Sequence, residues 1–599
     1  MDKIQEILAG AKDFFVDTWD VLSTLASSPD GGGLVYTAVA RWIFIALALF
    51  IVIKSIVSLL KSKNPSEVWA YFNVNDNISY PITHWENAIG RAKNCDLIVD
   101  DPMASRNQGT LSRSDDGVWR FKDLGSKNGT YVNGKRVDSG ASVVVEPGDE
   151  ITIGQSRCML FPISLEEQRN NMQMRASDTI LLSPWPSLIA ITIFQLMTVL
   201  QLKVSIGEEF SSSITVSFLG LAILMWGYVI FMRSLKGRGF EMETIAFFLC
   251  TLSLAVTSSK YPTGVLKQFI AITIGVFLFV AMCTYLRNLE RAKAIRMYMY
   301  AAAALLLVFN LIFGQTLFGA SNWVVIGGIS FQPSELVKLA FIWAGAASLD
   351  ELLEKKNSLI FMLFSGFCFC CLALMGDFGT AIIFFVTFLV ISFLRSGDFT
   401  KLILIVGVAF VGGLMVLKFK SYVAHRFAAW GHVWEMADDA GFQQTRTMSA
   451  SASGGLIGVG AGAGWLKNIP ASDTDLVFGF LTEEWGLIIA LLAILSLITL
   501  SIFAVRSILA GRSTYYTIAS CSAMSMFLFQ TMLNVFGSVD LLPLTGVTLP
   551  FVSNGGTSMI SAWGLLAFLK AADTRANASF AVTQKDKAIP AGRRRRRAK

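Results

Sequence analysis

Acidic side chains are clustered where a long polar connector of the chain returns to an apolar run at about residue 480. Asp473 and Asp475 precede this run, and Glu483 and Glu484 lie at its start. A carboxylate placed close to a hydroxyl group can accept its proton and so act as a general base. The alternative for Glu483 and Glu484 is an ordinary solvated helix start. The four residues therefore crowd acidic groups at the edge of an apolar region, where charges usually line a cavity or a pathway.

Three further charges lie at or between apolar runs. Glu335 and Lys338 are close enough in sequence to project from one face of a helix. Asp377 separates two apolar runs. Charged side chains within a membrane are costly, and they usually line a cavity or a pathway. For Glu335 and Lys338, the alternative is a plain ion pair at the membrane boundary.

The composition indicates which class of protein positions these groups. Of 599 residues, 53% are hydrophobic and 16% are charged, and the chain has 45 Phe and 14 Trp. A soluble globular protein carries roughly a quarter of its residues as charges, and disordered chains are far less apolar. The composition therefore excludes both classes and predicts a polytopic α-helical membrane protein. The net charge of +7 gives no indication of a nucleic-acid partner.

Apolar windows recur along the chain, each about 20 residues long, which is enough to cross a bilayer. We expect about three N-terminal spans, one at residues 36–61 and a hairpin at 185–233, followed by about ten spans at residues 240–572. Lys and Arg are concentrated in every second connector, and such connectors face the cytoplasm. The N-terminal segment 1–35 and the 418–480 connector are then extracytoplasmic, and the basic tail 573–599 is cytoplasmic.

Residues 65–170 contain no apolar window and are expected to form a cytoplasmic domain. Short β-prone runs at residues 96–99, 117–124, 128–132 and 150–153 alternate with glycine-containing turns. This pattern is typical of hairpins and predicts an all-β sandwich.

Three ordered blocks in this region resemble the forkhead-associated (FHA) domain: Ala88-Ile89-Gly90-Arg91, Ser105-Arg106 and Asn128-Gly129-Thr130. The resemblance implies that Arg91, Ser105, Arg106 and Asn128 bind a phosphothreonine-containing protein, through charge-assisted hydrogen bonds to the phosphate. Gln108 stands where the family has a loop-bracing histidine. The alternative is a degenerate sandwich that only mediates protein contacts.

The rest of the chain resembles the SEDS family, the RodA/FtsW-type proteins of bacterial cell-wall growth. The resemblance covers residues 240–572, and its motifs occur in one order: Phe331-Gln332-Pro333-Ser334-Glu335-Leu336-Val337-Lys338, Gly376-Asp377-Phe378-Gly379-Thr380, Ser453-Gly454-Gly455, Asp473-Thr474-Asp475-Leu476-Val477-Phe478, Thr482-Glu483-Glu484-Trp485-Gly486 and Leu549-Pro550-Phe551-Val552-Ser553-Asn554-Gly555-Gly556.

This resemblance implies a glycosyltransferase in the bacterial cytoplasmic membrane that polymerises lipid II into glycan strands. It also implies a class B penicillin-binding transpeptidase as partner. Asp475 has the position of the family's catalytic aspartate, and we expect it to be the general base. Asp473 stands where the family commonly has histidine, and with Asp475 it is a candidate site for a divalent cation, Mg²⁺ or Mn²⁺.

The remaining substrate-binding candidates divide into two groups. The cations are expected near the departing diphosphate, whose negative charge they would offset: Lys338, Arg426, Arg446 and Lys467. The other candidates come from the motifs and the acidic cluster: Glu335, Asp377, Asp473, Glu483, Glu484 and Ser553.

Two other functions remain open at this point: a flippase that transports lipid II, and a non-catalytic scaffold that docks a phosphorylated partner and a transpeptidase. The sequence does not distinguish division, elongation and sporulation. A glycine-rich run at residues 454–464 lacks the Lys-Ser/Thr of a phosphate-binding loop, and it predicts tight packing of a segment that skims or re-enters the membrane.

Overall fold

The computed structural model describes residues 31–61, 68–170 and 182–573, apart from short gaps at 77, 94, 114–116, 168, 236, 318–319, 328, 350–354, 397–398 and 510–512. Most of the predicted N-terminal segment 1–35 and of the basic tail 573–599 lies outside the described residues.

Every apolar window of the sequence lies within a helix. Ten helices in the described ranges are long and apolar enough to cross a membrane. The long helices are α2 (Gly31–Lys61), α4 (Trp185–Ile206), α5 (Ser212–Ser234), α6 (Glu241–Lys260), α7 (Val265–Leu286), α9 (Arg296–Phe313), α10 (Pro333–Leu349), α11 (Lys355–Met375), α12 (Phe378–Ser396), α13 (Phe399–Phe419), α16 (Val477–Leu509), α17 (Thr514–Ser538) and α18 (Gly556–Ala571). Three short helices connect them: α8 (Leu289–Ala294), α14 (Ser421–Ala429) and α15 (Phe442–Gly454).

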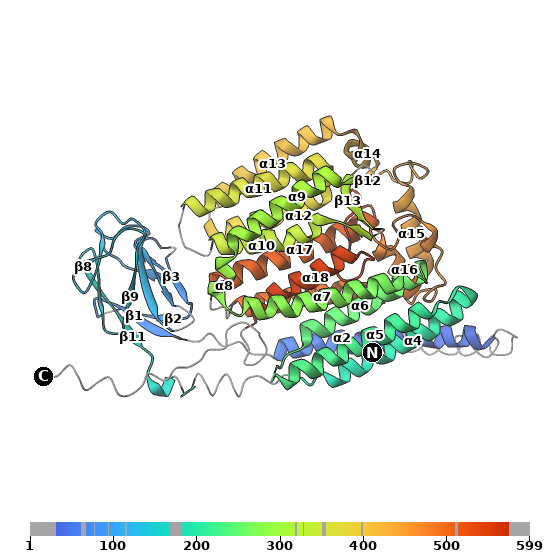
Figure 1. Ribbon diagram of the computed structural model, residues 1–599, viewed down its shortest axis with the longest axis horizontal. Coiled ribbons are helices and arrows are strands. Elements are labelled where there is room, and N and C mark those ends of the chain that lie inside the picture. The colour runs from blue at the N-terminus through green and yellow to red at the C-terminus, as the bar shows by residue number, and fades with distance from the viewer. Residues whose placement is uncertain are drawn as a thin grey trace, which may run out of the picture.

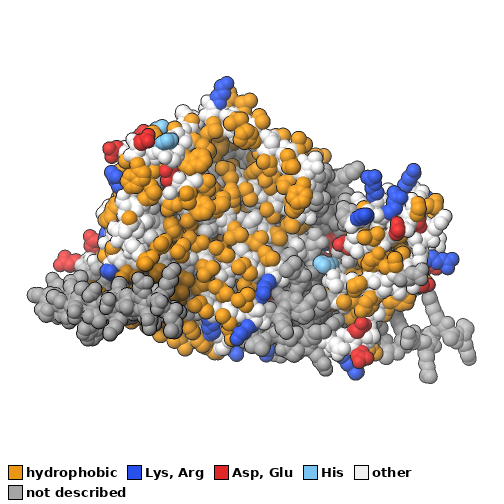
Figure 2. All heavy atoms as spheres, turned by 180° about the vertical axis from the view of Figure 1, so that it is seen from behind, with side chains coloured by type: hydrophobic (Ala, Val, Ile, Leu, Met, Phe, Trp, Pro, Cys, Tyr) orange, Lys and Arg blue, Asp and Glu red, His pale blue; other side chains and the backbone are white. Residues whose placement is uncertain are grey.

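The long helices run side by side, with a β-sandwich at one end of the bundle and α14, α15 and short strands at the other (Figure 1). The N-terminal helices are part of the bundle, because α2 packs against α4, α6 and α16, and α5 packs against α4 and α7. Seen from behind, hydrophobic side chains cover the broad side of the bundle and most charged side chains lie toward its edges (Figure 2). Such a surface suits contact with lipid.

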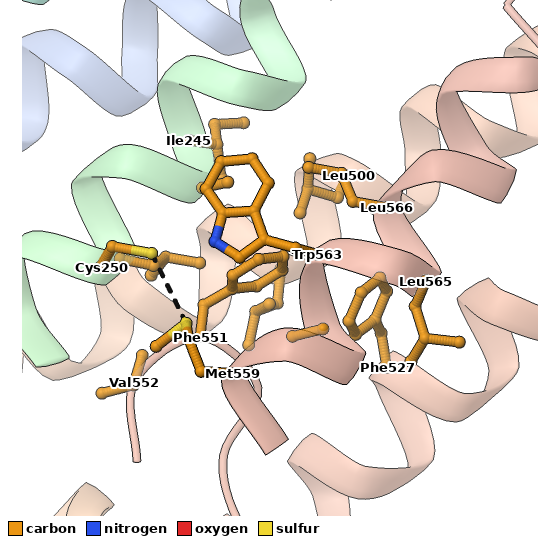
Figure 3. Packing of buried hydrophobic residues seen from close by; sticks show 14 of the residues in the cluster. Ile245, Cys250, Leu500, Phe527, Phe551, Val552, Met559, Trp563, Leu565 and Leu566 are labelled. Carbon is orange, nitrogen blue, oxygen red and sulfur yellow. Dashed lines mark hydrogen bonds between the residues drawn. The ribbon is translucent and has the colours of Figure 1, made fainter. Parts of the chain in front are cut away.

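Buried hydrophobic side chains, aromatic ones among them, pack around Trp563 of α18 (Figure 3). The Trp563 ring lies 5.2 Å from Phe247, 5.5 Å from Phe279 and 5.6 Å from Phe551, measured between ring centroids. Phe551 belongs to the loop before α18, so this core also anchors a loop at the end of the bundle.

The β-sandwich consists of two sheets, in the strand orders β2-β1-β11-β10-β7-β8 and β4-β3-β5-β6-β9. Their bounds are β1 (Ala70–Val74), β2 (Ile78–Ile82), β3 (Glu86–Gly90), β4 (Leu97–Ile98), β5 (Gly109–Arg113), β6 (Trp119–Asp123), β7 (Thr130–Val132), β8 (Lys135–Arg136), β9 (Ser142–Val145), β10 (Glu150–Ile153) and β11 (Ser156–Pro162). Each predicted β-prone run contains a strand, and buried Phe72, Ile89 and Phe121 help to form a separate core. The predicted fold class is confirmed.

One element was not anticipated from the sequence. Between α9 and α10 the chain forms an antiparallel sheet of β12 (Gln315–Leu317), β13 (Ala320–Ile326) and β14 (Ile329–Phe331). It lies at the end of the bundle opposite the β-sandwich (Figure 1).

The glycine-rich run packs against a break in α16. Gly486 has a positive φ of 85° and interrupts the helix. The carbonyls of Glu483 and Glu484 instead accept hydrogen bonds, both of 2.9 Å, from the N–H groups of Val459 and Gly460. Because buried backbone groups need partners, the glycine-rich run completes the hydrogen bonding that the broken helix lacks.

Only residues without a side chain allow this approach of two backbones. A Cβ at Gly486 would lie 2.3 Å from the carbonyl oxygen of Leu456, and one at Gly458 would lie 2.4 Å from that of Glu484. The tight packing predicted for the run is therefore present.

We expect Gly486→Ala to destabilise the protein, because the added methyl would collide with backbone and the positive φ is strained for alanine. Thermal unfolding in detergent should show a Tm lower by roughly 3 °C or more. Gly366→Ala is the matched control, since a Cβ at Gly366 of α11 would meet no atom within 4 Å. Equal Tm values for the two variants would contradict this packing.

Candidate functional site

Asp475 lies in a tight turn that leads directly into α16. The turn is built around Ala471, which has a positive φ of 58°. The Ala471 carbonyl accepts hydrogen bonds from the N–H groups of Thr474, Asp475 and Leu476, at 3.2, 3.0 and 3.2 Å. The Asp475 backbone is thus fixed by local geometry before any side chain contributes. We call residues 471–476 the Asp475 turn.

Side chains from two neighbouring elements hold the Asp475 turn in place. Asn534 of α17 donates to the Asp475 carbonyl at 2.9 Å, and Ser553 Oγ donates to the Thr474 carbonyl at 2.6 Å. Asn554 binds Asp473 twice, through its N–H to the carbonyl at 2.9 Å and through Nδ2 to Oδ2 at 2.8 Å. Ser553 was predicted to bind substrate. In the structure, its hydroxyl binds the backbone of the Asp475 turn.

Asp475 is half-buried, and its surroundings disfavour the charged form of its carboxylate. Burial raises its pKa to about 6, and the negative charges of Asp473 and Asp377 add to this rise. A hydrogen bond from Thr474 and the positive charge of Arg426 lower the pKa and only partly offset the rise. A carboxylate with such a pKa is well suited to accept a proton near neutral pH.

Arg426 and Asp475 approach each other across Gly546. A Cβ at Gly546 would lie 3.4 Å from Asp475 Oδ2 and 3.9 Å from Arg426 Nη1. Arg426, on α14, also donates to the Leu544 carbonyl at 3.2 Å. Of the predicted cations, Arg426 is therefore the one that the structure brings to Asp475.

Asp473 is buried and forms an ion pair with Lys260, at 2.8 Å between Nζ and Oδ1. The sequence did not single out Lys260, because a lysine at the end of an apolar helix has the pattern of an ordinary membrane-boundary residue. With Asn554 on Oδ2, both carboxylate oxygens of Asp473 have protein partners.

The divalent cation suggested for Asp473 and Asp475 has no preformed site in the described residues. Among them, no group of three or more His, Cys, Asp or Glu side chains could hold a metal ion. Lys260 already supplies the positive charge beside Asp473. The residues thus do not fit a cation held by this chain alone.

Asp377 is buried just before α12 and accepts hydrogen bonds from three groups. Its Oδ1 accepts from the Thr380 N–H at 3.1 Å, and its Oδ2 accepts from Asn322 at 3.1 Å and Gln332 at 3.3 Å. Asp377 thereby caps α12 and connects it to β13 and to the residue before α10.

Glu335 and Lys338 form an internal ion pair, at 2.8 Å, and Lys338 also donates to Gln530 at 3.1 Å. Lys338 is only 1% exposed, so the pair is buried rather than a solvated boundary contact. Gln530 donates in turn to the Thr548 carbonyl at 2.8 Å. The network braces the loop before α18.

Glu483 and Glu484 are also buried, which makes the solvated-helix-start interpretation wrong. Glu483 accepts hydrogen bonds from the N–H groups of Trp465 and Leu466, both at 2.9 Å, and Glu484 accepts one from Ser259 of α6. The Glu483 contacts join the connector before the Asp475 turn to α16, and the Glu484 contact joins α6 to α16.

Arg446 and Lys467 have other partners. Arg446 pairs with exposed Asp438 at 3.7 Å and lies over the Phe442 ring at 5.0 Å. Lys467 donates to the Gly462 carbonyl at 3.1 Å. Their predicted contact with a diphosphate stays a prediction.

In the β-sandwich, the four predicted phosphate-binding residues converge on one set of loops. Asn128 donates to the Met103 carbonyl at 2.7 Å, and Ser105 Oγ accepts from the Lys127 N–H at 3.0 Å. The Arg91 N–H donates to the Ser105 carbonyl at 3.0 Å. Arg91 and Arg106 are exposed, so both guanidinium groups can reach a ligand.

Gln108 braces these loops in place of the family's histidine. It is 1% exposed. Its Oε1 accepts from the Ser105 N–H at 2.8 Å, and its Nε2 donates to the Gly129 carbonyl and to Thr130 Oγ1, both at 3.0 Å. One amide thus connects two of the loops that carry the candidate residues.

We expect Asp475→Asn to raise the Tm above pH 6. The folded-state pKa, about 6, is above the ordinary 3.8, so ionisation destabilises the folded state as pH rises from about 4 to 6. In melting curves between pH 4 and 8, the Tm of the variant should exceed that of the wild type by about 1–3 °C. This difference should grow up to pH 6 and then stay constant. Asp438→Asn, with a side chain 98% exposed, should show no such trend; a pH-independent Asp475→Asn effect would contradict the raised pKa.

Comparisons with known proteins agree with this architecture. A family model described as "Cell cycle protein", covering FtsW, RodA and SpoVE, matches residues 240–578, and an FHA domain model matches residues 87–154. The chain is 28% identical over 353 residues to the probable peptidoglycan glycosyltransferase FtsW of Escherichia coli O6:H1, covering 55% of this chain and 83% of that relative.

Two solved structures are similar to separate parts of the chain. A structure titled for coordination of polymerization and crosslinking by a peptidoglycan synthase complex has a TM-score of 0.46 and 25% identity, and covers 55% of this chain and 96% of that chain. An FHA domain from a study of phosphothreonine-dependent interactions has a TM-score of 0.15 and 26% identity, and covers 16% of this chain and 99% of that chain.

The sequence match spans more than half of the chain and contains the Asp475 turn, Arg426 and the buried Glu335–Lys338 pair. The chain therefore belongs to the FtsW/RodA/SpoVE family and carries, between α2 and α4, an FHA domain.

Proposed function

We propose that this protein is a peptidoglycan glycosyltransferase that polymerises lipid II into glycan strands, with Asp475 as general base. The observation that carries the proposal is Asp475 itself: a carboxylate with a pKa of about 6, beside Arg426, at one end of a membrane bundle. The relatives named as probable peptidoglycan glycosyltransferases share the family of this chain.

In the proposed reaction, a sugar hydroxyl of lipid II attacks the anomeric carbon of another glycan unit. A new glycosidic C–O bond forms, and the bond from that carbon to the polyprenyl diphosphate breaks. Asp475 accepts the hydroxyl proton, which makes the attacking oxygen more nucleophilic. The diphosphate leaves with the bonding electrons, and positive charge near it stabilises the transition state.

Arg426 is the best placed cation for the departing diphosphate, because its charge already acts on Asp475. We keep Lys338, Arg446 and Lys467 as further candidates. Lys338 would have to act through the loop that it braces, since it is buried and paired with Glu335.

The proposed topology places Asp475 on the extracytoplasmic side and the FHA domain in the cytoplasm. In support, the β-sandwich and the α15 end lie at opposite ends of the bundle (Figure 1). The lipid tails would then stay in the membrane while the sugar headgroups meet at its outer surface. A class B penicillin-binding transpeptidase is the proposed partner that cross-links the product.

We further propose that the FHA domain regulates or recruits the enzyme by binding a phosphothreonine-containing protein. Support comes from exposed Arg91 and Arg106 beside Ser105 and Asn128, on loops that Gln108 braces. A phosphothreonine carries close to two negative charges, which such a group of donors can bind.

The glycosyltransferase proposal predicts that Asp475→Asn abolishes glycan synthesis, because the amide cannot accept the proton. Purified protein in liposomes, with and without a candidate transpeptidase, should convert lipid II to polymer, and the variant should lose at least about 100-fold in rate. Glu435→Gln is the control, an exposed acid in the connector before α15. Undiminished polymer from Asp475→Asn would refute this role, and lipid II translocation without polymer would favour a flippase.

The FHA proposal predicts that Arg91→Ala weakens binding of a phosphothreonine peptide to the full-length protein by at least about tenfold, from loss of a charge-assisted hydrogen bond. Fluorescence anisotropy with phosphorylated and unphosphorylated peptides measures this. Arg120→Ala, at an exposed position of β6, should have no effect. Equal binding of the two peptides by the wild-type protein would support a plain contact module instead.

A further inference from the structure

Lys260 is the last residue of α6 and makes three contacts with the chain that leads into the Asp475 turn. Its ammonium group lies 2.8 Å from Asp473 Oδ1, 2.9 Å from Ser472 Oγ and 3.0 Å from the Ile469 carbonyl oxygen. Its side chain is 9% exposed. All three donor hydrogens of the ammonium group can therefore be used on one short segment.

Asp473 connects Lys260 to the loop before α18, because Asn554 binds its other carboxylate oxygen and its carbonyl. Asp473 is 3% exposed. A buried carboxylate that loses the cation paired with it is left uncompensated, which is strongly unfavourable. The segment would then have to rearrange.

The effect of such a change would reach Asp475 by two routes. Asp473 and Asp475 belong to the same turn, in which the Asp475 N–H and its neighbours share the Ala471 carbonyl. In addition, the negative charge of Asp473 acts directly on the Asp475 carboxylate. Other titratable groups that face these two carboxylates are Arg426, Asp377 and Tyr261.

We propose that Lys260 is a positioning residue for Asp475: by clamping residues 469–473 and neutralising Asp473, it holds the general base in its working place and limits the negative charge beside it. This inference rests on the proposed function of Asp475. Lys260 does not touch the reacting groups in this role, so it changes turnover more than substrate affinity.

The test uses full-length protein in liposomes and measures lipid II polymerisation. Lys260→Met should lower kcat about tenfold or more, since small displacements of a catalytic group have effects of this size. The KM should stay within about twofold, and the acidic limb of the pH profile should move to higher pH, because unpaired Asp473 holds the proton on Asp475 more tightly. Lys260→Arg should retain most of the activity.

The double variant Lys260→Met/Asp473→Asn separates positioning from simple structural loss. It removes both charges, so the acidic limb should return to the wild-type pH and part of kcat should recover, even if Lys260→Met alone is poorly folded. Lys267→Met, at an exposed position near the start of α7, is the control and should behave as wild type.

The outcomes are distinct. An inactive wild-type protein counts against the proposed function, whereas an active wild type with unchanged Lys260→Met overturns the inference on Lys260. The inference is also overturned if the single and double variants lose equal activity with an unshifted pH profile, or if KM rises while kcat is unchanged.

Discussion

The site depends on one physical constraint: backbone hydrogen bonds must be completed where regular helix stops inside the bundle. Residues 454–476 are mostly non-helical, yet they lie against α16 and carry Asp475 at their end. In this chain, N–H groups of the glycine-rich run donate hydrogen bonds to the carbonyls of Glu483 and Glu484, which have no helical partner at the break in α16. Without these bonds the buried backbone groups of the glycine-rich run would lack partners, and the connector that leads into the Asp475 turn would lose one of its supports.

Most acidic residues of the family motifs support the structure, whereas Asp475 is the proposed general base. Glu483 binds backbone N–H groups, Asp377 caps a helix, and Glu335 neutralises Lys338. Each of these carboxylates has its partners within the protein. Asp475 differs, because it is only half-buried and its carboxylate oxygen Oδ2 faces Arg426 across Gly546. Rigid surroundings of this kind keep a reactive group in one geometry.

The extra N-terminal helices contribute to the same support. Arg41 of α2 donates to the Val459 carbonyl, and a Cβ at Gly460 would lie 2.9 Å from Thr37. At the other end of α2, Arg506 of α16 donates to the Leu59 carbonyl. The helix that precedes the FHA domain is thus held by the glycine-rich run near one end and by α16 near the other.

Hydrophobicity and turn chemistry made the helices and the sandwich strands predictable, because both are local properties of the sequence. The β12–β14 sheet was missed, since its short strands have no distinct alternation. The pairing of Lys260 with Asp473 was also missed: it joins residues far apart in the chain, and only the folded bundle brings them together. Gln108 was recognised as a substitution, but its bracing role required the loop geometry. The catalytic role of Asp475 stays a prediction.

The hairpin of α4 and α5 has a consequence for how such a chain could arise. Two antiparallel crossings return the chain to the side from which it started, so the FHA domain and the beginning of α6 share one side of the bundle. The hairpin therefore adds an even number of crossings before α6 and leaves the orientation of α6 unchanged. A signalling module followed by such a pair can be gained or lost in evolution without inverting the family core in its membrane.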